Sequence, residues 1–115
     1  MVSSVLSPDV AISDRLAAPV LSREDGRTVV WLDGEHDVST LLVLTDTLAG
    51  AISADDADLV VDLSEVTFIG AASFDELIRG RAILRRQSRT LTLRSPSRCA
   101  QRLLDVCGFS DLIEP

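Results

Sequence analysis

The stretch DLVVDLSEVTFI, residues 58–69, decides the fold class of this 115-residue chain. Its first half, Leu59 to Leu63, is a run of β-branched and aliphatic residues interrupted only by Asp62. Such a run is typical of a strand that is covered on both faces, as in parallel sheets. We expect Val66 to Ile69 to extend this strand or to follow it. Because a helical pattern lies on each side of the stretch, the sequence predicts an α/β fold.

Three helices are predicted from apolar residues that recur at spacings of three and four. Each has a residue at its start or end that favours a helix terminus. A strand of alternating type, residues 90–94, separates the second helix from the third. The helix limits are Ser39 or Thr40 to the residue before Asp55, Gly70 to the arginines that follow it, and Ser97 to Gly108.

The N-terminal part of the domain is predicted to be a hairpin. Residues 20–23 and 28–32 are strand-like and flank Asp25-Gly26, a dipeptide that favours a tight turn between strands. A second such pair, Asp33-Gly34, is expected to close the second strand. The order β-β-α-β-α-β-α predicts a mixed β-sheet with an opening hairpin, covered by helices, with right-handed crossovers between parallel strands.

Length and composition indicate a single domain, which we assign to residues 18–115. Residues 1–17 show no sustained period and are treated as an N-terminal arm with room for a short edge strand. No run of about 18 apolar residues occurs, and no basic segment precedes an apolar block at the N-terminus. We therefore expect a cytoplasmic protein without a membrane partner.

Charge is divided unevenly along the chain. The formal net charge of −7 argues against direct nucleic-acid binding, which requires a basic face. Every basic residue is Arg, a usage that resembles proteins of high-GC bacteria. Residues 77–104 contain no acid, and their arginines either solvate helix exteriors or form a basic face for an acidic partner or a phosphate. These arginines are Arg79, Arg81, Arg85, Arg86, Arg89, Arg94, Arg98 and Arg102.

Catalytic chemistry finds little support in the sequence. His36 is the only histidine, and because no second His can complete a metal or acid-base site, we interpret it as part of a solvated acidic loop. No glycine-rich phosphate loop is present, and no nucleophile-His-acid set can be assembled. We expect no enzyme activity, no metal and no cofactor.

The two cysteines, Cys99 and Cys107, fall on one predicted helix. Eight residues of helix separate them by about 12 Å along the axis, which is too far for a disulfide within one copy. We expect two buried or half-buried free thiols, because free Cys usually behaves as a small hydrophobic residue.

Two segments together resemble the STAS domain, the family of bacterial anti-sigma-factor antagonists, or anti-anti-sigma factors. Residues 29–37, VVWLDGEHD, are similar to its opening strand with Gly-Glu and Asp, and residues 58–69 are similar to its central strand. The resemblance covers about residues 18–113. It implies a protein-binding regulator of transcription that works by partner switching with a kinase-type anti-sigma factor.

One motif departs from the family pattern. In the family the central strand leads into Asp-Ser-Ser/Thr-Gly, and the first Ser is phosphorylated by the partner kinase. Here these four positions are Gly70, Ala71, Ala72 and Ser73. We expect the turn to remain while the phosphorylation switch is lost. Ser73 is expected to be an exposed structural serine, with a phosphorylation site there as the alternative.

The resemblance also implies the residues that contact a partner. By position they are Asp37 and the four residues of the turn, and by proximity Thr40 and Asp75 are added. The competing interpretation is a STAS-type scaffold or small-anion sensing module that uses the Arg-rich face. In that case the chain could assemble with copies of itself, and the sequence leaves a homo-oligomer open.

Overall fold

The structure is a computed structural model that describes residues 18–114. The predicted arm, residues 1–17, and its short edge strand lie outside the described residues. The elements follow the predicted order and end in a short 3-10 helix. They are β1 (Val20–Glu24), β2 (Arg27–His36), α2 (Leu41–Ala54), β3 (Leu59–Ile69), α3 (Ala71–Arg86), β4 (Leu91–Arg94), α4 (Arg98–Cys107) and η1 (Ser110–Leu112).

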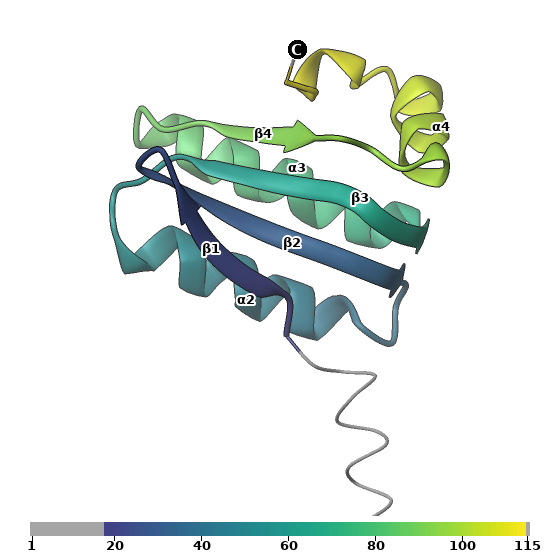
Figure 1. Ribbon diagram of the computed structural model, residues 1–115, viewed down its shortest axis with the longest axis horizontal. Coiled ribbons are helices and arrows are strands. Elements are labelled where there is room, and N and C mark those ends of the chain that lie inside the picture. Colours follow the sequence, from purple (N-terminus) through teal and green to yellow (C-terminus); the bar gives the residue numbers. More distant parts are fainter. Residues whose placement is uncertain (1–17, 115) are drawn as a thin grey trace, which may run out of the picture.

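The four strands form one mixed sheet in the order β1-β2-β3-β4. The β1–β2 hairpin is antiparallel, whereas β2–β3 and β3–β4 are parallel, so the predicted sheet type is confirmed. Helices α2 and α3 lie together on one face of the sheet, behind it in Figure 1. Val60 and Val61 of β3 are fully buried although they point to opposite faces, as expected for a central strand.

The core between sheet and helices is almost entirely aliphatic. Leu44 and Leu48 of α2 and Leu77 and Leu84 of α3 are at most 2% exposed. Helix α4 adds Ala100 and Leu104 to the same cluster. Its ends are as predicted, because the hydroxyl of Ser97 accepts a hydrogen bond from the Ala100 amide and Gly108 adopts φ +77°.

A polar network lies on the sheet face opposite α2 and α3. Arg94 donates from Nε to Asp62 and from a terminal nitrogen to Glu24, both at 2.9 Å, and its guanidinium lies 4.9 Å from the ring centre of Trp31. Asp62 is 4% exposed and also accepts hydrogen bonds from the amide and hydroxyl of Ser64. Burial raises the pKa of Asp62, but the hydrogen bonds from Ser64 and Arg94 outweigh it and leave the pKa below its ordinary value. The one acid in the apolar run of β3 is therefore buried and paired.

The predicted end of β2 at Asp33-Gly34 is wrong. The strand continues to His36, and its register with β3 shifts before Asp33 and after Gly34. Gly34 has φ +70°, a conformation that glycine adopts without strain. The dipeptide thus forms an irregularity within a paired strand rather than a turn.

Two predictions about side-chain exposure also need correction. Only Cys99 is half-buried, whereas Cys107 is exposed, like all of residues 105–108 at the end of α4. Arg89 is 7% exposed and donates to the carbonyls of Ile52 and Ala57, so it belongs to the interior. Arg94 is engaged in the network above. The Arg-rich face is smaller than the sequence suggested.

Candidate functional site

The carboxyl ends of β2 and β3 bring the predicted site residues to one edge of the sheet. The two strands are parallel neighbours, and His36 pairs with Ile69 at their ends. The amide of Gly70 donates to the carbonyl of His36 at 2.9 Å. Asp37 and the turn before α3 are therefore adjacent, although more than thirty residues separate them in the sequence.

Asp37 organises the loop that leads into α2. Its carboxylate accepts hydrogen bonds from the amide and the hydroxyl of Ser39, at 2.9 and 2.6 Å. The hydrogen bond from the Ser39 hydroxyl is the main cause that holds the pKa of Asp37 below its ordinary value. Thr40 precedes α2, and its hydroxyl accepts from the Asp37 amide at 3.1 Å. The Thr40 side chain therefore forms its hydrogen bond within this loop and does not cap α2.

The first turn of α3 presents small side chains to solvent. Gly70 is the N-cap residue with φ −88°, and no side chain caps the helix there. Ala71, Ala72 and Asp75 are exposed. A Cβ atom on Gly70 would lie 3.5 Å from the Phe68 ring and 3.8 Å from the His36 carbonyl, which are ordinary contacts. The turn would therefore accommodate a side chain in place of this glycine.

Ser73 is not the exposed serine that we expected. It is 0% exposed, and its hydroxyl has no hydrogen-bond partner among the described residues. Ser73 is the third residue of α3 and faces the sheet, where there is room only for a small side chain. A kinase would have to open the first turn of α3 to reach the hydroxyl.

His36 is likewise not in a solvated loop. It is the last residue of β2 and 6% exposed, and its Nε2 lies 3.0 Å from the Asp33 carbonyl oxygen. Burial lowers the pKa of His36, and the hydrogen bond and negative charge of Asp33 oppose this effect only in part. Its role is to hold the end of β2, through its backbone, against the turn before α3.

Three exposed apolar residues at this edge were missed by the sequence analysis. Val38 is 79% exposed, Leu42 is 71% exposed and Phe68 is 47% exposed. They belong to the Asp37 loop, the first turn of α2 and the end of β3. A signal was available, since Val38 lies between polar residues next to a strand end. We call residues 37–40 and 70–72, with Leu42 and Phe68, the strand-end surface.

Other kinds of site find no counterpart in the described part of the chain. Within residues 18–114, no three His, Cys, Asp or Glu side chains come together as a set of metal ligands. Over the same residues, none of the helices has the length and apolar character needed to cross a bilayer.

Comparisons with known proteins agree with this geometry. A family model described as "Mlab, STAS domain" matches residues 20–114. An anti-sigma factor antagonist from Mycobacterium paratuberculosis is similar in structure, with 26% identity, a TM-score of 0.74 and coverage of 85% of each chain. No curated protein matches the chain.

Two further solved structures share the fold at lower identity. The anti-sigma factor antagonist SpoIIAA, in its unphosphorylated form, has 15% identity and a TM-score of 0.74 over 84% of this chain and 86% of its own. An anti-sigma-factor antagonist (STAS) domain protein from Planctomyces limnophilus has 20% identity and a TM-score of 0.72 over 84% and 87% of the two chains. The mixed four-stranded sheet with three helices is thus the architecture of these proteins.

Proposed function

The chain belongs to the STAS domain family, and on that premise we propose that it is a non-catalytic regulator that binds an anti-sigma factor through the strand-end surface. The proposal places it in the bacterial cytoplasm, where sigma factors act. The partner is an anti-sigma factor of the kinase type, as the resemblance to anti-sigma-factor antagonists implies.

The exposure of Val38, Leu42 and Phe68 at one edge supports this proposal most directly. Large apolar side chains that remain in water are a signature of interaction sites when they gather together. Full burial of an exposed side chain of this kind contributes about 1.5–3 kcal/mol, and each of these residues would contribute in proportion to its exposed fraction. The small residues Ala71 and Ala72 beside them allow a partner to approach the start of α3 closely.

The usual switch is absent from this surface. Ala71 and Ala72 have no oxygen that could accept a phosphoryl group, and Gly70 supplies no carboxylate beside them. A phosphate would add nearly two negative charges to the contact surface and weaken binding. Without it, binding is persistent, and control comes from abundance, from a different modification or from a ligand elsewhere.

The anion-sensing alternative loses Arg89 and Arg94, which are bonded within the domain, and keeps the other six arginines. Arg81 and Arg85 line a cavity of about 210 Å³ with Thr90 and Thr92 of the β4 segment. Asp111 lines the same cavity and would repel an anion, so this cavity gives the alternative little support. A melting temperature that rises with added phosphate would revive the alternative, since a ligand that binds only the folded state stabilises it.

The test uses purified protein and the kinase-type anti-sigma factors of its source organism. We expect Val38→Asp to weaken binding at least tenfold, because it places a charge in the apolar part of the contact. Val106→Asp is the matched control, since Val106 is 80% exposed on α4 and outside the strand-end surface. Equal binding by the two variants would contradict the proposed surface.

The missing switch has its own test. The protein is incubated with its partner and ATP, and phosphate is mapped by mass spectrometry while affinity is measured before and after. We expect no phosphate and no change. The double variant Gly70→Asp with Ala71→Ser should acquire phosphate-dependent release, because position 70 has room for a side chain. Stoichiometric phosphate on Ser73 with a large fall in affinity would show that the switch has moved rather than disappeared.

A further inference from the structure

Strand β1 is an edge strand whose outer side is unpaired within the described residues. The sheet order places β2 on its inner side, and no element of residues 18–114 lies on the other. Natural edge strands are usually protected by Lys, Pro, a bulge or very short length. Residues 20–24, VLSRE, form a short strand with two charged residues, but they contain no Lys and no Pro and pair with β2 without a register shift. Among residues 18–114, nothing therefore pairs with the outer edge of β1.

The hairpin geometry identifies which backbone groups are free. Asp25 and Gly26 both have positive φ, so the two-residue turn makes Glu24 and Arg27 a hydrogen-bonded pair. Hydrogen-bonded and non-hydrogen-bonded pairs alternate along the hairpin from there. Leu21 and Arg23 of β1 therefore direct their backbone N–H and C=O groups away from β2. Thr28 confirms the alternation, because its amide donates to Asp58 on the β3 side rather than to β1.

These free groups are complementary to a second copy of themselves. In an antiparallel pair of β1 strands centred on Ser22, Leu21 of each copy lies opposite Arg23 of the other. The backbone groups of both residues point outward, so each Leu21–Arg23 pair exchanges two hydrogen bonds. The twofold axis makes two such pairs, and the interface has four backbone hydrogen bonds. Ser22 lies opposite Ser22, Val20 lies opposite Glu24, and no two like charges are opposed. We propose that two copies of this chain associate through the outer edges of their β1 strands, about a twofold axis at Ser22.

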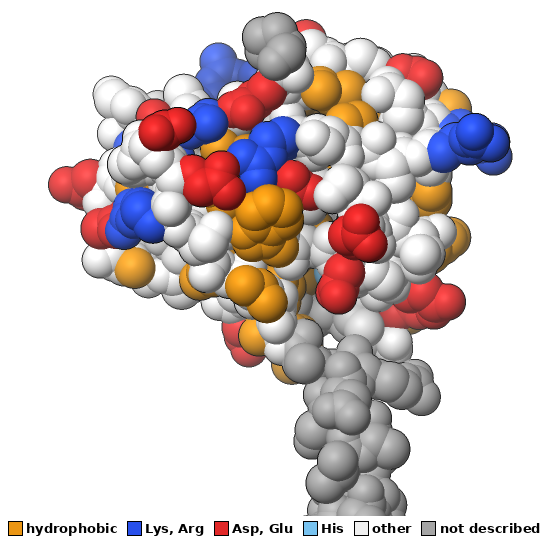
Figure 2. Space-filling view, viewed as in Figure 1, with side chains coloured by type: hydrophobic (Ala, Val, Ile, Leu, Met, Phe, Trp, Pro, Cys, Tyr) orange, Lys and Arg blue, Asp and Glu red, His pale blue; other side chains and the backbone are white. Residues whose placement is uncertain are grey.

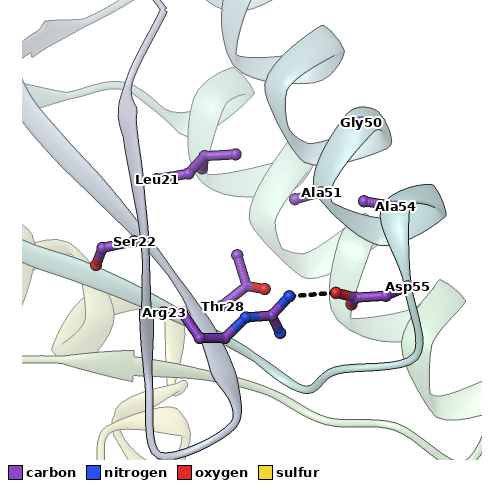
Figure 3. Close-up of a pocket in the computed structure, with 8 residues that line it drawn as sticks. All are labelled: Leu21, Ser22, Arg23, Thr28, Gly50, Ala51, Ala54 and Asp55. Atoms are coloured by element: carbon purple, nitrogen blue, oxygen red, sulfur yellow. Dashed lines mark hydrogen bonds and ion pairs between the residues drawn. The ribbon is translucent and has the colours of Figure 1, made fainter.

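The side chains along this edge support the same partner. Val20 is 66% exposed and Leu21 is 47% exposed, one on each face of the strand. Leu21 and Arg23 border a groove of about 230 Å³ between β1 and α2. Gly50, Ala51 and Ala54 form its helical side, and the small size of these residues leaves the groove open (Figure 3).

An ion pair lies at one end of this groove, beside the place where the second strand would bind. Arg23 extends from β1 to Asp55 at the end of α2 and lies across one end of the groove (Figure 3). Leu21 of the second copy would lie beside the aliphatic part of this arginine and cover the ion pair. On the opposite face, the second copy would cover Val20, which pairs with Trp31 of β2. Figure 2 shows a hydrophobic area among charged side chains on this side of the molecule.

Net charge sets the conditions under which the dimer forms. Each copy carries a formal charge of −7, so association brings like charges together at long range. Salt screens this repulsion without weakening the backbone hydrogen bonds or the apolar contacts. Self-association should therefore strengthen as ionic strength rises, in contrast to an interface held by ion pairs.

The first experiment measures the mass of the full chain by sedimentation equilibrium from about 1 µM to 1 mM, because an interface of one short strand binds weakly. We expect the mass to rise from 12.4 kDa toward twice that value. Leu21→Pro should restore the monomer without unfolding the hairpin, since the amide it removes bonds nothing in β2. Leu21→Thr retains that amide and should retain the dimer. A monomer throughout this range would overturn the proposal, and so would a dimer that Leu21→Pro leaves intact.

A second experiment tests the register. In a background with Cys99→Ser and Cys107→Ser, Ser22→Cys should form a covalent dimer under mild oxidation, because directly opposite residues of a non-hydrogen-bonded pair bring their Cβ atoms within about 5.5 Å. Leu21→Cys is the matched control and should cross-link far more slowly, since position 21 faces position 23. Equal rates for the two variants would refute this register. A protein that stays monomeric but binds its anti-sigma factor would refute the dimer and leave the proposed function standing.

Discussion

Arg94→Met should destabilise the domain strongly, because Arg94 neutralises a carboxylate that the sheet buries. Asp62 is 4% exposed, and removal of Arg94 leaves it with only the two donors of Ser64. Breaking a buried pair by deleting one partner costs about 3–5 kcal/mol. The Arg94 side chain is 22% exposed, so we take the lower end, about 3 kcal/mol.

Smaller losses accompany this one and do not change the expectation. The contact of Arg94 with the Trp31 ring contributes about 0.5–1 kcal/mol. The ion pair with Glu24 is more exposed and contributes at most about 1 kcal/mol. For a domain of this size, a total of about 3.5–5 kcal/mol lowers the melting temperature by roughly 14–20 °C.

The assay is urea unfolding followed by circular dichroism, with Arg79→Met as the control. Arg79 is 70% exposed and lies 3.5 Å from Glu76, so its removal should change the free energy of unfolding by less than about 0.5 kcal/mol. An Arg94→Met protein within about 1 kcal/mol of the parent would refute the reasoning, because the cost of an unpaired buried charge is several times larger.

The pH dependence of the difference provides an independent check. In the parent, the lowered pKa of Asp62 contributes stability that is present above the unfolded pKa of about 3.9 and is lost as pH falls through the folded pKa. In the variant, burial remains while the donors of Arg94 are lost, so the folded pKa rises. The gap in stability between parent and variant should therefore narrow as pH falls from 7 toward 4. A constant gap would mean that packing, not charge, explains the loss.

Three further predictions follow from buried or separated side chains. Val61→Asp should lower the free energy of unfolding by several kcal/mol, because Val61 is 0% exposed; a melting temperature within a degree or two of the parent would contradict its central position. Ser73→Ala should leave stability unchanged or raise it by about 1 kcal/mol in urea unfolding, since it removes a buried hydroxyl without a partner, and a clear loss would reveal a hidden hydrogen bond. Cys99 and Cys107 should not link within one copy, so intact mass under oxidising conditions should show no monomer two hydrogens lighter.

The two Asp-Gly pairs show how far the sequence could predict the fold. Asp25-Gly26 ends one strand and begins the next, so local turn chemistry was enough to place it. Asp33-Gly34 has the same chemistry, yet β2 continues because β3 offers a partner beyond it. Pairing between strands that are distant in the sequence decided the outcome there, and no local pattern reports it.

The candidate site shows the same limit for side chains. Its position was predictable, since Asp37 and Gly70 follow two strands that a parallel sheet places side by side. The exposure of Val38 and the burial of Ser73 were not, because both depend on which face of each element meets the sheet. Residue type alone predicts the opposite in each case.

The buried Arg89, in the segment between α3 and β4, has a consequence for how the domain opens. Arg89 donates to the carbonyls of Ile52 in α2 and of Ala57 in the loop between α2 and β3, as well as to the side chain of Gln87. The last turn of α2 therefore cannot fray without uncovering a guanidinium that belongs to the segment between α3 and β4. The amides of residues 52–58 and 87–90 should exchange with deuterium as one cooperative unit, so two surface segments that look independent in the sequence melt together.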